Sequence, residues 1–284
     1  MSLELPQERE ILEKRELATN IYEMVIHAPK VARAAHAGQF ILIMVDEKGE
    51  RIPMTLVDWD SEQGWIKMVY QEVGTSTIKL SLRNAGDQLY YLAGPLGHPS
   101  KVSRYGRVVM VGGGVGIPAL YPIARELKRL GNHITTIIGA KTSNALIYEN
   151  EMKQFSDELY VTTDDGSRGI KGYTVDALRM LLDRGERFDA SWYIGPALMM
   201  KACTEASAGR IPVSYSSLNS LMVCGVGMCG ACRITVGGRI ALTCVDGPEF
   251  DSYQVSWKEL AIRLQAYKKE EMISLQMLKG AGRI

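Results

Sequence analysis

The hydrophobic pattern of the chain changes its period near residue 100. Before that point, the apolar run 39–45 and the alternating run 65–71 are separated by Gly, Asn, Asp and Pro, which is typical of β-strands joined by turns. Residues 10–29 predict two further short strands around an Ala-Thr-Asn turn. Several short strands in succession predict a small antiparallel β-barrel over residues 1–100.

From residue 107 the pattern alternates between strand and helix. An apolar strand at 108–112, a glycine turn, a helix at 118–130 and a strand at 134–139 form a βαβ unit. The later segments of this kind are a strand at 159–163, a helix at 175–182 and a strand at 191–195. Together they predict a doubly wound α/β domain over residues 101–213, with ligands at the carboxyl ends of its parallel strands.

The last part of the chain, residues 214–284, predicts a small third domain. Residues 233–244 read as strand, Gly-Gly turn and strand. Residues 257–279 have helical periodicity and predict one amphipathic helix, which packs on its own protein or docks a partner. The cysteine-containing part of this domain is too small to be stable without a metal cluster or its neighbours.

Composition and charge exclude several classes of function. The 284 residues carry 33 basic and 32 acidic side chains, a formal net charge of +1, which does not suggest nucleic-acid binding. The longest uncharged run, 108–124, contains four glycines and two prolines, and therefore predicts a strand, turn and helix start, not a membrane span. With no evident targeting segment, we expect a cytoplasmic protein with no membrane partner.

Four of the five cysteines follow the spacing C-x4-C-x2-C-x11-C. They are Cys224, Cys229, Cys232 and Cys244. This is the pattern of plant-type [2Fe–2S] ligation, in which thiolates from one short loop converge on two irons. The intervening Gly225, Gly227 and Gly230 suit a loop that needs positive φ angles and close approach of N–H groups to sulfur.

Zinc, disulfides and unrelated buried thiols are the three alternatives to an iron–sulfur cluster at these cysteines. Structural zinc prefers two C-x2-C pairs, and disulfides suit a secreted chain. The cysteines could also be small buried side chains with no common ligand. The fifth, Cys203, has no partner in the pattern and is expected to be a small buried residue on a helix.

Two segments of the barrel predict a ligand. The segment Arg51-Ile-Pro-Met-Thr55 offers a guanidinium beside a rigid turn, and Gly74-Thr-Ser-Thr77 places three hydroxyls where a strand ends. Arginine matches a phosphate or a flavin ring, and a Gly/Thr/Ser turn can present N–H groups to a pyrophosphate. The alternative is that Arg51 is a surface charge and Gly74–Thr77 an ordinary helix cap.

The glycine turn Gly112-Gly-Gly-Val-Gly-Ile-Pro118 indicates a nucleotide site. Ile117 stands where the dinucleotide fingerprint has its third glycine, so the motif is imperfect. Small residues still let a cofactor approach the backbone, and Pro118 suits the first turn of a helix whose N-terminus attracts an anion. The alternative is that the glycines only allow tight strand–helix packing.

The succession of these motifs resembles the ferredoxin reductase-like flavoproteins with a C-terminal [2Fe–2S] domain. The matching motifs are Arg-x-Pro-x-Thr at 51–55, the glycine turn, Thr-Asp-Asp-Gly-Ser at 163–167, Gly-Pro at 195–196, the four cysteines and Asp-Gly-Pro-Glu-Phe-Asp at 246–251. Within that group the chain is similar to the electron-transfer subunits of dihydroorotate dehydrogenase. It is more similar to the small (alpha) subunits of NADH-dependent ferredoxin:NADP oxidoreductase, also called sulfide dehydrogenase alpha.

The resemblance implies three cofactors: FAD, NAD(H) and a [2Fe–2S] cluster. FAD would lie near Arg51, Pro53, Met54, Thr55, Gly74, Thr75 and Ser76. NAD(H) would lie near Gly113, Gly114, Gly116, Asp164, Gly195 and Pro196. Pro53 departs from more distant reductases, which have a ring-stacking tyrosine there. Cys224 departs from some small subunits, which have Asp as the first cluster ligand.

The choice between NAD and NADP depends on two neighbouring turns. Lys141 follows the second strand of the βαβ unit and could meet a 2′-phosphate. Asp164 and Asp165 end the next strand, where they would repel a phosphate and could bind a ribose diol. We therefore expect NAD.

The expected function is that of an oxidoreductase subunit. By resemblance, hydride passes between nicotinamide and flavin, and single electrons pass through the cluster to a larger FAD/iron–sulfur beta subunit that handles ferredoxin and NADP(H). One alternative is the electron-transfer subunit of NAD-dependent dihydroorotate dehydrogenase. A second, from another class, is a non-catalytic electron carrier or zinc-stabilised interaction module.

Overall fold

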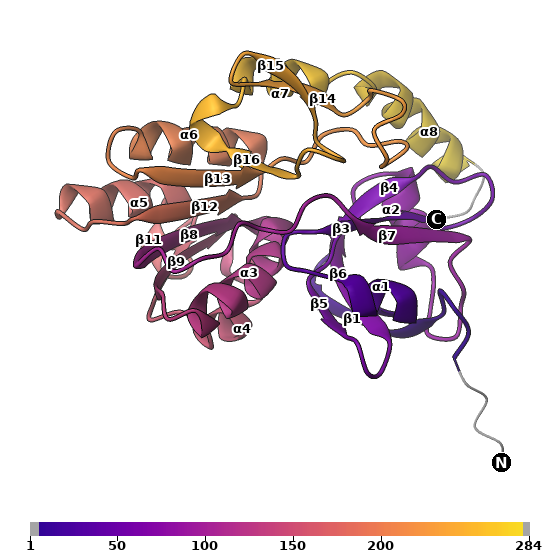
Figure 1. Cartoon of the computed structure of the whole chain (residues 1–284). Coiled ribbons are helices and arrows are strands. Elements are labelled where there is room, and N and C mark those ends of the chain that lie inside the picture. Colours follow the sequence, from indigo (N-terminus) through magenta and orange to yellow (C-terminus); the bar gives the residue numbers. More distant parts are fainter. Residues whose placement is uncertain (1–5, 281–284) are drawn as a thin grey trace.

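The computed structural model describes residues 6–280, and the N-terminal part of this range is a barrel of two antiparallel sheets (Figure 1). One sheet contains β1 (Ile11–Ala18), β2 (Ile21–His27), β6 (Trp65–Gln71) and β5 (Asp58–Asp60); the other contains β4 (Ile52–Thr55), β3 (Phe40–Met44) and β7 (Tyr91–Leu96). Two short helices, α1 (Pro29–Ala34) and α2 (Thr75–Ser81), accompany them. The predicted barrel is confirmed, and alternate residues such as Ile41, Ile43, Ile66 and Met68 fill its core.

The middle of the chain forms the predicted doubly wound α/β domain. Its sheet has the order β11-β10-β9-β8-β12-β13-β16. The parallel strands are β8 (Arg107–Gly113), β9 (His133–Ala140), β10 (Glu158–Thr163), β11 (Ile170–Lys171), β12 (Ala190–Ile194) and β13 (Val213–Ser217). The last strand, β16 (Glu249–Asp251), comes from the C-terminal part of the chain and pairs antiparallel with β13.

Helices cover both faces of this sheet (Figure 1). One face carries α3 (Ile117–Arg129) and α4 (Glu149–Lys153), and the other carries α5 (Thr174–Asp183) and α6 (Ala197–Ser207). Short 3₁₀ turns, η1 (Gly114–Gly116) and η2 (Ser143–Ala145), follow β8 and β9. Because successive side chains of a strand point to opposite faces, Val108 and Met110 join the core under α3, while Val109 and Val111 join the core under α5.

The C-terminal part begins with the cysteine loop, residues 222–232, followed by the predicted hairpin. The hairpin consists of β14 (Arg233–Val236) and β15 (Arg239–Leu242), and a 3₁₀ turn, η3 (Ser252–Gln254), follows β16. The single helix predicted over 257–279 is wrong, because the structure has two helices, α7 (Trp257–Arg263) and α8 (Lys268–Gly280). Their inward residues pack in different places: Leu260 lies in the core under α6, and Leu278 lies against α2.

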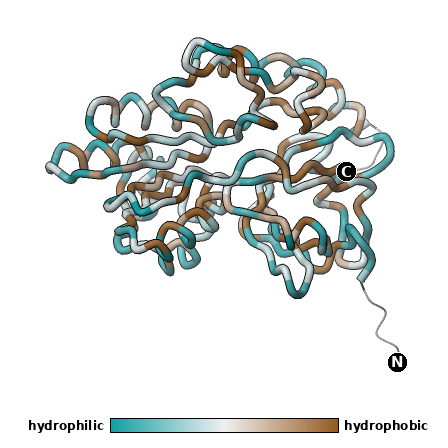
Figure 2. Tube along the Cα trace, viewed as in Figure 1, coloured by the Kyte–Doolittle hydropathy of each residue, from teal (hydrophilic) through white to brown (hydrophobic). Residues whose placement is uncertain are grey.

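Apolar residues lie along the central strands, as the hydropathy colouring shows (Figure 2). The barrel and the α/β domain share one core, since Ile21, Val57 and Val69 pack with Leu120 and Ile123 of α3. Across residues 6–280, the structure has no helix that is long and apolar enough to cross a membrane.

Candidate functional site

The cysteine loop has the backbone that its glycines predict. Gly225, Gly227 and Gly230 have φ angles of 73°, 77° and 67°, in the left-handed region that favours glycine. The bends bring two of the thiols together and point a backbone N–H at a third. The Sγ atoms of Cys232 and Cys244 lie 3.2 Å apart, and the N–H of Cys229 donates to Cys224 Sγ at 3.4 Å.

Further backbone N–H groups point at sulfur. Gly227 donates to Cys244 Sγ at 3.3 Å and Ala231 donates to Cys229 Sγ at 3.5 Å. Burial opposes ionisation of Cys224, but hydrogen bonds from the N–H groups of Cys229 and Val226 outweigh it and lower the pKa of Cys224 to about 6. Burial, followed by the neighbouring Cys232 thiol, raises the pKa of Cys244 to about 12.

The thiols and their backbone donors fit an iron–sulfur cluster. Cys232 and Cys244 lie side by side, and N–H groups point at the sulfurs of Cys224, Cys229 and Cys244. A [2Fe–2S] cluster takes two cysteines on each iron, and N–H groups donate to its sulfurs. All four thiols are free of disulfides.

The predicted flavin segment forms strand β4 of the barrel. It pairs with β3 in the register Phe40↔Thr55 and Leu42↔Pro53. Arg51 is exposed, and its guanidinium carbon lies 5.0 Å from the ring centroid of Tyr91 on β7. Sequence reasoning missed this aromatic residue, because Tyr91 lies 40 positions from Arg51 and only strand pairing brings them together.

The Gly74–Thr77 segment is a helix cap, the simpler of the two predictions for these residues. Gly74 is the N-cap of α2, and Thr77 Oγ1 accepts hydrogen bonds from the N–H groups of Val73 and Gly74, both at 3.0 Å. The space beside Gly74 is open, since a methyl group there would meet no atom within 4 Å. Thr75 and Ser76 follow it in the first turn of α2, so the cap still leaves room for a ligand.

The glycine turn and the Gly195-Pro196 turn lie against each other at the carboxyl ends of β8 and β12. A methyl group on Gly116 would lie 2.3 Å from the carbonyl oxygen of Ile194, and one on Gly113 would lie 2.6 Å from Met199 Sδ. Packing alone therefore requires Gly116, which meets backbone, whereas at Gly113 the flexible end of Met199 could move aside. Gly114 differs, because its φ is 54° and the space beside it is open. The two turns adjoin at the switch point of the sheet, where α/β domains bind ligands.

The loops after β9 and β10 bring Lys141 and Asp164 into one region. The N–H of Asp164 donates to the carbonyl of Ala140 at 3.1 Å, and the N–H of Asp165 donates to that of Lys141 at 3.3 Å. Lys141 and both aspartates are exposed. The carboxylate of Asp165 accepts hydrogen bonds from the hydroxyl and the N–H of Ser167 in the same turn, and these bonds lower the pKa of Asp165.

The cysteine loop lies directly on the barrel. Phe40 and Leu42 of β3 share a small core with Met222, Cys232 and Cys244. A methyl group on Gly225 would lie 2.6 Å from Leu42 Cδ1 and 2.9 Å from Leu96 Cδ1. The same β3 strand thus pairs with the predicted flavin segment and contacts the thiol loop.

Glu249 is a half-buried acid at the junction of all three parts of the chain, and sequence reasoning assigned it no role. Its carboxylate accepts from the Ser100 hydroxyl at 2.6 Å and from the Trp192 indole N–H at 3.2 Å. Burial raises the pKa of Glu249 to about 7, against the opposing effect of these bonds. The signal in the sequence was the Asp-Gly-Pro-Glu-Phe-Asp motif, which identifies no contact by itself.

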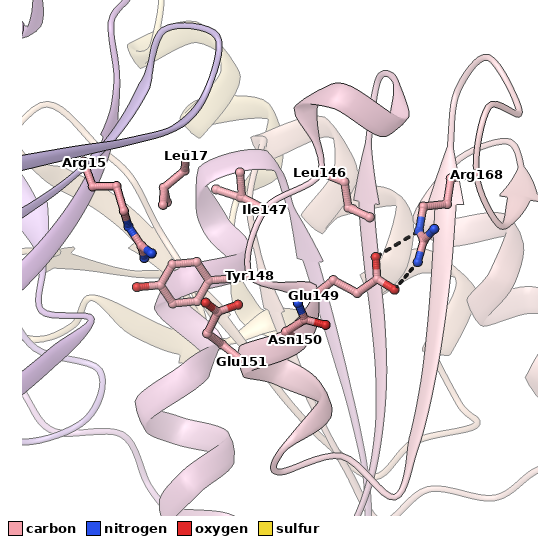
Figure 3. Close-up of a pocket in the computed structure, with 9 residues that line it drawn as sticks. All are labelled: Arg15, Leu17, Leu146, Ile147, Tyr148, Glu149, Asn150, Glu151 and Arg168. Atoms are coloured by element: carbon pink, nitrogen blue, oxygen red, sulfur yellow. Dashed lines mark hydrogen bonds and ion pairs between the residues drawn. The ribbon is translucent and has the colours of Figure 1, made fainter.

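A cavity of about 320 Å³ lies between the barrel and residues 146–151 (Figure 3). Arg168 on its wall donates to both carboxylate oxygens of Glu149, at 2.9 and 2.6 Å. Tyr148 has a φ of 60° and donates to the buried Glu23 of the barrel at 2.5 Å; burial and then this bond raise the pKa of Tyr148. No predicted cofactor or metal residue, all of which lie within 6–280, lines this cavity. We interpret it as part of the contact between domains.

Comparison with known proteins agrees with this geometry. Residues 219–256 match the family described as the iron-sulfur cluster binding domain of dihydroorotate dehydrogenase B. The chain is 49% identical over 275 residues to a homolog of the dihydroorotate dehydrogenase B (NAD(+)) electron transfer subunit from Thermotoga maritima, with 96% of each chain covered. The electron transfer subunit itself, from Geobacillus thermodenitrificans, is 36% identical, with 86% of this chain and 96% of that one covered.

Solved structures extend the comparison. A chain of the NADH-dependent reduced ferredoxin-NADP oxidoreductase, described in work on flavin-based electron bifurcation, is 46% identical with a TM-score of 0.92, covering 97% of this chain and 99% of that chain. A ferredoxin NADP+ reductase from Neisseria gonorrhoeae, at 17% identity and a TM-score of 0.56 over 72% of this chain and 91% of its own, shares the fold alone. The chain therefore belongs to the family of dihydroorotate dehydrogenase B electron transfer subunits and their homologues, and it has a ferredoxin reductase-like fold.

Proposed function

We propose that the chain is the NAD(H)-linked electron-transfer subunit of an NADH-dependent ferredoxin:NADP oxidoreductase. In this proposal it exchanges electron pairs with NAD(H) and single electrons with a larger FAD/iron–sulfur beta subunit, which handles ferredoxin and NADP(H). Support comes from the match to the oxidoreductase chain, which covers 97% of this chain, whereas the match to the Geobacillus electron transfer subunit covers 86%.

The observation that carries the proposal is the position of Leu42. Its backbone pairs with Pro53 of the flavin segment, and its side chain meets the position of Gly225 in the cysteine loop. Leu42 is completely buried, so its side chain is shielded from water where strand β3 meets the cysteine loop. Electron transfer needs such a short, dry separation, whereas a zinc-stabilised interaction module would not.

Each cofactor has a set of residues that would hold it. Cys224, Cys229, Cys232 and Cys244 would hold the cluster; Arg51, Pro53, Met54, Thr55, Gly74, Thr75 and Ser76 would hold FAD; Gly113, Gly114, Gly116, Asp164, Gly195 and Pro196 would hold NAD(H). When bound, the flavin converts hydride chemistry into single-electron chemistry, and the cluster carries one electron at a time. The exposed Arg51 guanidinium is free to orient a flavin or phosphate while it rests on Tyr91.

We propose NAD(H) over NADP(H) for this subunit. The exposed carboxylate of Asp164 at the end of β10 would repel a 2′-phosphate and can accept from a ribose diol. Lys141 is exposed on the adjoining loop and would favour the 2′-phosphate of NADP(H). Substitution of Asp164 therefore tests whether this carboxylate sets the preference for NAD(H). Asp164→Asn is expected to lower the preference for NADH over NADPH by about tenfold, the equivalent of 1.4 kcal/mol.

A protein partner fits the surface around the thiols. Cys229 is exposed, and the nearby apolar side chains of Val223, Val226 and Met228 are 47%, 63% and 82% exposed. Exposed apolar patches of this kind mark interaction sites. We also propose a cytoplasmic location, supported by thiols that must stay reduced to bind iron. The division into domains 1–100, 101–213 and 214–284 is our working proposal.

The test is anaerobic purification of the native complex. We expect FAD, two irons and two acid-labile sulfides per copy of this chain, bleaching of flavin absorbance by NADH, and a larger FAD/iron–sulfur companion identified by mass spectrometry. Protein without flavin, or with zinc in place of iron and sulfide, would contradict the proposal.

A second candidate function is suggested by the name of the Thermotoga maritima relative. Electron transfer to a dihydroorotate dehydrogenase would use the same proposed residues in this chain, whose residues 219–256 match the iron-sulfur cluster binding domain of that enzyme. Co-purification with an FMN-containing catalytic subunit, and reduction of NAD+ by dihydroorotate in that complex, would select this function.

A further inference from the structure

The C-terminal helix α8 packs against α2, the helix that begins at the residues proposed to hold FAD. Ser274 Oγ lies 2.9 Å from Thr75 Oγ1, the first residue of α2. One turn later, Leu278 is only 6% exposed and lines a small cavity together with Lys79 and Leu82. The hydrogen bond and the contact at Leu278 attach α8 to the barrel.

The two contacts give the relative direction of the helices. Ser274 lies level with the start of α2, and Leu278 lies level with its end, so α8 and α2 run parallel. The first six residues of α8, 268–273, therefore extend past the start of α2 by about 9 Å, at 1.5 Å per residue. In Figure 1, α8 spans the edge of the molecule between the cysteine loop and α2.

The extension continues beyond the N-terminal end of α2, the end that Gly74 caps and where the space beside Gly74 is open. Tyr267 adjoins the first residue of α8, its carbonyl accepts from the N–H of Glu271 at 2.9 Å, and it is 54% exposed. Tyr267 and Ser274 are two helical turns apart, so the two share one face of the helix. Lys268 and Lys269 are balanced by Glu270 and Glu271 in the extension, so its effect on a bound dinucleotide is coverage, not net charge.

We propose that α8 covers the FAD site and slows release of the dinucleotide, with Tyr267 as its aromatic contact. This inference rests on the assignment of Gly74, Thr75 and Ser76 to FAD in the proposed function. It gives the C-terminal helix a role in FAD binding, although no flavin motif of the sequence lies in that helix. The attachment is small, because Ser274, Leu275 and Leu278 are the residues of α8 that are not exposed.

The test compares two adjacent substitutions in the FAD-loaded full chain. Leu278→Asp places a charge in the contact with α2, whereas Met277→Asp introduces the same charge at a side chain that is 72% exposed. Release of FAD after dilution is followed by the rise in flavin fluorescence. We expect release at least tenfold faster for Leu278→Asp and within twofold of the unchanged chain for Met277→Asp.

A second variant keeps the proposal falsifiable if Leu278→Asp does not fold. Tyr267→Ala removes an exposed ring, and we expect it to speed FAD release about three- to tenfold with an unchanged thermal midpoint. The role of α8 is refuted, and the proposed function stands, if the unchanged chain holds FAD and Tyr267→Ala releases it at the same rate. Where Leu278→Asp folds, it must also release FAD at that rate. An unchanged chain that binds no FAD overturns both.

Discussion

Substitution of Gly225 tests whether the cysteine loop is held against the barrel. Gly225→Ala adds a methyl group that would lie 2.6 Å from Leu42 Cδ1 and 2.9 Å from Leu96 Cδ1, well inside the usual carbon–carbon contact of about 3.5–4.0 Å. The residue also has a φ of 73°. Gly230→Ala is the matched control, because Gly230 has a φ of 67° in the same loop and open space beside it.

The two alanine variants share the cost of a left-handed backbone, but only Gly225→Ala also has the cost of overpacking. The left-handed backbone costs alanine about 1–2 kcal/mol at either position. Overpacking adds about 1–3 kcal/mol at Gly225 alone, since Leu42 is completely buried and cannot swing into solvent. We therefore expect Gly225→Ala to cost about 2–5 kcal/mol in the free energy of unfolding, and Gly230→Ala about 1–2 kcal/mol.

The assay is the midpoint of heat-induced loss of the cluster's visible absorbance, which falls by about 2–4 °C for each kcal/mol in a chain of roughly this size. Adding Leu42→Val, which removes the Cδ atoms, should recover part of the extra loss in Gly225→Ala and none of the loss in Gly230→Ala. Equal midpoints for the two alanine variants would refute the contact between loop and barrel, and with it the short path between the two sites.

Three further outcomes are expected. Cys232→Ser should lose most of the bound iron and sulfide, whereas Cys203→Ala, in the buried α6 thiol, should retain both; iron loss in the second variant would mean that the ligand assignment is wrong. Tyr148→Phe removes the hydrogen bond to buried Glu23 and should cost about 1.5–3 kcal/mol in urea unfolding, with a cost near zero showing that the bond does not join the domains. The pKa of Glu249 is raised from 4.5 to about 7, so its contribution to the free energy of unfolding should be complete below pH 4.5 and lost as the pH rises through 7. The loss should be at most about 3 kcal/mol. Glu249→Gln should flatten this pH dependence of stability, and an unchanged pH profile in that variant would contradict the assignment.

Local chemistry determined much of this protein from its sequence. The cysteine spacing predicts the ligand loop because all four thiols lie within one loop and one hairpin, and the positive φ angles of Gly225, Gly227 and Gly230 follow from the same short segment. The period of apolar residues predicts the barrel and the doubly wound sheet, since a strand buried on both faces needs continuous apolar residues such as those at 108–111. Cys203 was likewise correctly predicted as a buried helical residue.

Contacts between distant segments were decided only by the tertiary structure. The break between α7 and α8 has no Pro or Gly to announce it, and it arises because Leu260 and Leu278 pack against different parts of the molecule. Tyr91 beneath Arg51 depends on strand pairing across the barrel.

The contact between Leu42 and Gly225 likewise depends on the tertiary structure. Local sequence sets the conformation of each segment, but which segments meet depends on how the apolar surfaces of the whole chain are buried together. The cysteine spacing therefore predicts the ligands of the cluster, while the fold alone decided that these cysteines lie beside the strand that pairs with the predicted flavin segment.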